Sequence, residues 1–65
     1  MTFKTRRIEI NETYIEVWFN NVEYCVAIGD TKNIQNQYTV YRSSSETEAV
    51  KRFIALSNSF REILG

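Results

Sequence analysis

The residues of this sequence that could do chemistry are few, and three glutamates form the most regular pattern. Glu9, Glu16 and Glu23 recur every seven residues, and neighbouring carboxylates can act as a general acid and base or hold a hard cation. Cys25 could supply a nucleophilic thiolate, but a carboxylate across the sheet at Glu16 disfavours the charged thiol. We therefore expect the glutamates to form a solvated face, with Arg7 paired to Glu16. We expect Cys25 to be a small side chain that is packed or partly exposed.

The composition excludes most catalytic chemistry. The chain has no histidine and one cysteine, so it lacks the ligands of a Cys/His zinc site and the parts of a Ser-His-Asp or Cys-His nucleophile. It has no proline and only two glycines, and therefore no Gly-rich phosphate-binding loop. We expect a protein that is not an enzyme and that uses no metal and no cofactor.

Length and charge narrow the class of protein further. Residues 1–65 are enough for a single domain, and a domain of this size buries only roughly 60% of the surface that its unfolded chain exposes. Hydrophobic residues make up 43% of the chain without any long apolar run, which indicates a globular domain with no membrane span. The eight basic residues balance the eight acidic ones, which argues against a protein that binds by neutralising phosphates.

The single cysteine also bears on location. One cysteine cannot form an internal disulfide, and no charged and then apolar leader opens the sequence, so we expect the reducing cytoplasm. Compact chains of this length are common among viral and mobile-element proteins, which gives one hypothesis for the origin of this one.

The chain reads as strands followed by a helix. Apolar side chains alternate with polar ones from residue 8 to residue 28, and again after a polar loop. We expect strands over about residues 3–10, 13–19, 22–28 and 37–42. In the last of these, Tyr38 and Val40 would lie on one face, with Thr39 and Tyr41 on the other.

Asparagines mark the two predicted hairpin turns. Asn20-Asn21 is a candidate two-residue turn, because Asn accepts the positive φ that such a turn needs. Asn11-Glu12 is a second candidate, although Glu is a poor turn residue, and it would place Ile8 opposite Ile15 and Arg7 opposite Glu16. The Asn20-Asn21 turn would place Phe19 opposite Val22 and Trp18 opposite Glu23. The same register would place Val17 opposite Tyr24 and Glu16 opposite Cys25.

A helix is predicted over residues 46–64. Ser45 and Glu48 have the spacing of a capping box, and Ser43 with Glu46 offers a second register. At 100° per residue one apolar stripe collects Ala49, Phe53, Leu56, Phe60, Ile63 and Leu64. Val50 and Ile54 widen that stripe.

The predicted fold is therefore α+β: an antiparallel three- to four-stranded β-meander followed by one C-terminal α-helix packed on one sheet face (ββββα). One helix covers one face and leaves the other uncovered. We expect the uncovered face to carry Arg7, Glu9, Tyr14, Glu16, Trp18, Glu23, Cys25, Ala27 and Tyr41. A helix on the Trp18 side would invert this assignment.

The uncovered face gives the main functional hypothesis. It is either a solvated sheet surface or a protein interface, because large aromatic side chains ringed by charge are typical of contact hot spots. We expect a non-enzymatic protein that binds another protein or itself, as a dimeric accessory factor or a stoichiometric inhibitor. The predicted anchors are Tyr14, Trp18 and Tyr41, with selectivity from Glu16, Glu23 and Arg7. Val50 and Ile54 offer a second surface.

Nucleic-acid binding is the alternative. The sheet aromatics could stack on bases, and Lys4, Arg6 and Arg7 could contact phosphates or simply guard an edge strand. Residues 8–30, however, contain five acidic residues and no basic one, which works against a phosphate backbone. A structural homodimer with no further partner is the third hypothesis.

Overall fold

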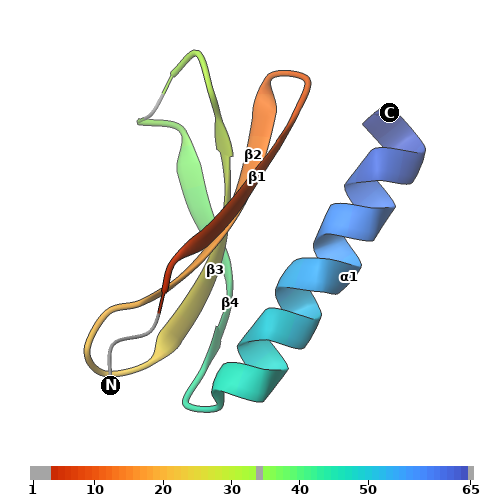
Figure 1. Cartoon of the computed structure of the whole chain (residues 1–65). Helices are drawn as coiled ribbons and strands as arrows, with labels where there is room; N and C mark the ends of the chain where they lie inside the picture. Colours follow the sequence, from red (N-terminus) through yellow and green to blue (C-terminus); the bar gives the residue numbers. More distant parts are fainter. Residues whose placement is uncertain (1–3, 34, 65) are drawn as a thin grey trace.

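The computed structural model describes residues 4–33 and 35–64 and confirms the predicted ββββα order. The four strands form one antiparallel sheet in chain order. They are β1 (Arg6–Ile10), β2 (Thr13–Phe19), β3 (Tyr24–Asp30) and β4 (Gln37–Ser43), followed by α1 (Glu46–Leu64). Figure 1 shows α1 running along one face of the sheet, so the molecule has two layers.

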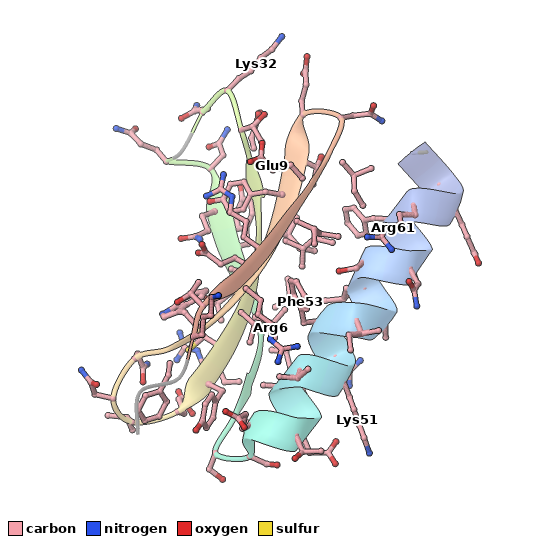
Figure 2. All side chains as sticks on the ribbon, viewed as in Figure 1. Arg6, Glu9, Lys32, Lys51, Phe53 and Arg61 are labelled. Atoms are coloured by element: carbon pink, nitrogen blue, oxygen red, sulfur yellow. The ribbon has the colours of Figure 1, made fainter. Side chains whose placement is uncertain are left out.

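The core lies between α1 and the sheet. Ile15, Val17 and Val26 are almost completely buried there and contact Ala49 and Phe53 of α1. Figure 2 shows Phe53 between the helix and the sheet. The side chains packed around this cluster are Ile8, Tyr24, Ile28, Tyr41, Leu56 and Phe60.

The helix begins at Glu46, as predicted. The backbone N–H of Glu48 donates to the Ser45 hydroxyl at 3.3 Å, which satisfies one of the orphan donors of the first turn. Ser43 does not cap Glu46; its hydroxyl accepts from the backbone N–H of Ser45 at 3.0 Å. Over the residues that the structure describes, no helix combines the length and apolar character needed to cross a membrane.

The apolar stripe of α1 is confirmed except at its end. Ala49 and Phe53 are buried and Phe60 is half-buried, whereas Ile63 is 77% exposed. Ile63 lies on the flank of the stripe, in the last turn of the helix. The side chain of Leu64 lies outside the described residues, as does residue 3, where the first strand was predicted to begin.

The first hairpin has the predicted register. Ile8 lies opposite Ile15 and Arg7 opposite Glu16, and Asn11 adopts a φ of 56° in the turn. Asn therefore takes the left-handed conformation that a two-residue turn requires.

The second hairpin is two residues longer than predicted. Phe19 pairs with Tyr24, and Asn20–Glu23 form a four-residue loop. The Asn20 side-chain oxygen accepts from the backbone N–H groups of Val22 at 2.9 Å and Glu23 at 2.8 Å, and this local closure competes with the shorter turn. Because the register moves by two residues, the residues of β2 and β3 keep their predicted faces. Val22 and Glu23, which were predicted to begin the third strand, lie in the loop instead.

β4 contains a bulge that the sequence pattern did not predict. Tyr41 pairs with Val26 and Thr39 with Ala27, so Val40 is an extra residue between two paired positions. One extra residue reverses the alternation of side chains. The predicted position of Tyr41 is therefore wrong: it lies on the α1 side, packed against the core.

Candidate interaction surface

The outer face, which we define as the sheet face opposite α1, is built on small residues. β3 contributes Cys25, Ala27 and Gly29, all of them buried. β2 places Trp18 opposite Cys25 and Tyr14 opposite Gly29. The prediction that Tyr14, Trp18, Cys25 and Ala27 share this face is confirmed. Of the two states expected for Cys25, the structure shows the packed one, with 3% of the residue exposed.

Tyr14 is buried without any helix above it. Its side chain is 4% exposed because its ring lies on the backbone of Gly29, where a Cβ atom would overlap the ring. The guanidinium carbon of Arg7 lies over the same ring, 3.9 Å from its centroid. The Tyr14 ring is therefore covered by the protein itself.

Tyr41 is covered in a similar way on the opposite side of the sheet. The guanidinium carbon of Arg52 in α1 lies 4.7 Å from the centroid of its ring. Of the three predicted anchors, Trp18 is therefore the one that remains both on the outer face and half-exposed.

Ion pairs border the outer face. The Arg7 guanidinium lies 3.8 Å (Nε) from Oε2 of Glu9 and 4.0 Å (Nη1) from Oε2 of Glu16. The pair with Glu16 was predicted from the sequence. Glu23 lies in the hairpin loop, 3.9 Å from Arg42 of β4, a partner that sequence reasoning missed. All these side chains keep substantial contact with water, so each pair adds little stability.

The seven-residue glutamate pattern does not form a metal site. Among the described residues, no group of three or more Asp, Glu, Cys or His side chains could hold an ion. No pocket opens among them either. The described part of the chain presents surfaces for contact, without a cavity for a small substrate.

Large apolar side chains are exposed on β4, on α1 and at the second hairpin. Tyr38 is 69% and Val40 47% exposed on β4, and Ile54 is 49% exposed on α1. The others are Phe19 and Val22 at the second hairpin and Ile63 at the end of α1. Sequence reasoning missed Tyr38 and Val40 as candidate contact residues, because it considered the two faces of the sheet and not its edges. Both residues lie on an edge strand.

The β4 edge, which we define as the side of Gln37–Ser43 that does not pair with β3, is chemically unlike the β1 edge. β1 and β4 are the two outer strands of the sheet. β1 carries Arg6 and Arg7, and Figure 2 shows Arg6 extending toward α1. β4 has no charged residue from Gln37 to Tyr41.

Comparison with known proteins finds no protein-family model, no curated protein and no solved structure that matches this chain.

Proposed function

We propose that the protein acts by binding another protein, without catalysing a reaction, and that the β4 edge is its main contact surface. The observation that carries this proposal is an edge strand with no charged residue from Gln37 to Tyr41 and with Tyr38 and Val40 exposed. An unpaired strand offers its backbone N–H and C=O groups to an extended segment of a partner, while exposed side chains supply specificity.

The contrast between the two edges supports this choice. Soluble proteins commonly guard edge strands with charged side chains, and Arg6 and Arg7 give β1 such a guard. β4 has no equivalent charge over residues 37–41, and its exposed Tyr38 and Val40 are residue types that favour strand pairing. An edge left open in this way is explained if a partner strand covers it.

The outer face stays a second predicted contact surface. Trp18 is its remaining anchor, with Glu16, Glu23 and Arg7 around it. Its support is smaller than that of the β4 edge, because Tyr14 is covered and Tyr41 lies on the α1 side. A dimeric accessory factor and a stoichiometric inhibitor are both forms of the binding that we propose, and the free, buried thiol of Cys25 supports a reducing cytoplasm as its location.

Nucleic-acid binding has less support than protein binding. A stacking platform needs open ring faces, and Arg7 and Arg52 already occupy the rings of Tyr14 and Tyr41. A salt titration separates the two functions, since affinity that depends on phosphate contacts must fall steeply as salt rises.

The proposal is tested by a pull-down from lysate of the cells that express the gene. The three baits are the wild-type chain, Val40→Lys and Trp18→Ala. Val40→Lys places a charge on the β4 edge, and Trp18→Ala truncates the anchor of the outer face. We expect Val40→Lys to lose the partner and Trp18→Ala to retain it, with near-native circular dichroism for both baits. Loss with Trp18→Ala alone would instead assign binding to the outer face, and equal recovery on all three would contradict both surfaces.

A further inference from the structure

We infer that the partner seated on the β4 edge is a second copy of this chain, paired antiparallel through β4 about a two-fold axis. The inference rests on the proposed function and names its partner. It would join the two four-stranded sheets into one continuous sheet with both helices on the same side.

The bulge at Val40 favours a second copy. Tyr38 and Tyr41 are three positions apart, yet both lie on the α1 side, opposite Ile28 and Val26. Residues directly opposite one another in an antiparallel pair share a face. A regular strand that paired with the β4 edge would therefore leave one β4 residue unpaired, just as β3 leaves Val40 unpaired. β4 of a second copy has the same irregular alternation, so its side chains can match those of the first copy on both faces along the whole strand.

Matching the faces leads to a definite register. Tyr41 of each copy lies opposite Tyr38 of the other, both on the α1 side. Arg42 then lies opposite Gln37 of the other copy, both on the outer face, and Val40 lies opposite Thr39 near the two-fold axis. Each dimer contains every one of these pairs twice.

The side chains brought together in this register are compatible. Tyr38, which is 69% exposed in the single chain, would pack beside the Tyr41 ring and the Arg52 guanidinium of the other copy. Arg42 faces a neutral amide, so no like charges oppose one another.

The interface is small. Two edges of seven residues each bury less than the roughly 1,200 Å² of a standard protein interface, so the dimer belongs to the weak, concentration-dependent class. Such a dimer is measured over a concentration series.

Sedimentation equilibrium from about 5 µM to 1 mM tests the inference on the full chain. We expect the average mass to rise from 7.7 kDa toward twice that value. Val40→Lys should remain a monomer, whereas Ile54→Lys, a matched control of nearly equal exposure on α1, should still dimerise. Tryptophan fluorescence and circular dichroism check that each variant is folded.

A charge change at Gln37 tests the register with little risk to folding, because this side chain is exposed. Gln37→Glu would face Arg42 of the second copy and should tighten the dimer by about fivefold at low salt, since the pair occurs twice. Gln37→Lys should weaken it by a similar factor. Equal affinities for the two variants would overturn the register.

Other outcomes overturn the inference as a whole. A wild-type chain that stays monomeric at about 1 mM would exclude the second copy, as would a dimer that tolerates Val40→Lys. The proposed function would survive a monomeric result if Val40→Lys still lost the captured partner. The two failures are therefore distinguishable.

Discussion

Tyr14 lies flat on the outer face because residue 29 has no side chain. A Cβ atom on Gly29 would overlap the far end of the ring, and the Arg7 guanidinium packs over the ring. The φ of Gly29 is not positive, so the backbone itself does not require glycine there. Space for the Tyr14 ring is what glycine provides.

Gly29→Ala should therefore destabilise the fold through Tyr14. We expect a loss of about 1–3 kcal/mol, because the added methyl group must push the ring and the Arg7 guanidinium off the sheet. Urea unfolding followed by circular dichroism measures this loss. In a Tyr14→Ala background the same change should cost much less, and an equal cost in both backgrounds would contradict the contact.

Among the elements, the loop Asn20–Glu23 shows how one side chain sets a register. The Asn20 oxygen accepts two backbone N–H groups, and Asn21 has a φ of 76°. The two residues therefore have different roles, although the sequence suggested that they formed one two-residue turn.

Substitutions in this loop separate those roles. Asn20→Ala removes the acceptor and should cost about 1 kcal/mol, which is the typical value of a side-chain cap on backbone donors. Asn21→Gly keeps positive φ available and should change stability by less than about 0.5 kcal/mol. Thermal unfolding of both variants provides the comparison, and a larger loss for Asn21→Gly would contradict this assignment.

The cap of α1 gives a second test at this scale. Ser45→Ala removes the acceptor for the Glu48 N–H and should cost about 1 kcal/mol. Ser44→Ala is the matched control, because Ser44 is exposed and outside this hydrogen bond. The thermal midpoint should fall for Ser45→Ala and stay near the wild-type value for Ser44→Ala; equal shifts would show that Ser45 is not the cap.

Local patterns predicted the order and faces of the elements but not every register. Alternation placed Trp18 and Cys25 on the outer face, and the Ser45 spacing placed the helix start. The bulge at Val40 was not predicted, because Gln37–Ser43 alternates equally well with or without an extra residue. Burial of Tyr41 against α1 favours the bulge, and that contact joins elements distant along the chain. Tyr41 was predicted as an anchor of the outer face, so its position on the α1 side weakens that face as the candidate surface.

At the scale of the whole molecule, one layer depends on the other. Ile15, Val17 and Val26 are buried only because α1 covers the sheet. A domain of 65 residues has about 3–10 kcal/mol of stability in total, so a single core contact is a large fraction of it. The two layers should therefore unfold together, with tryptophan fluorescence and helical circular dichroism following the same transition.

Phe53 and Ile54 are neighbouring hydrophobic residues of α1 that differ in burial. Phe53 is 6% exposed at the centre of the core, and Ile54 is 49% exposed. Phe53→Ala should cost about 3–5 kcal/mol, because it removes a buried ring and leaves a cavity between the layers. Ile54→Ala should cost under about 1 kcal/mol, since half of its side chain already contacts water. Urea midpoints at one fixed protein concentration give both values and keep any dimer contribution constant. Comparable losses for the two variants would show that α1 does not pack through the Phe53 face.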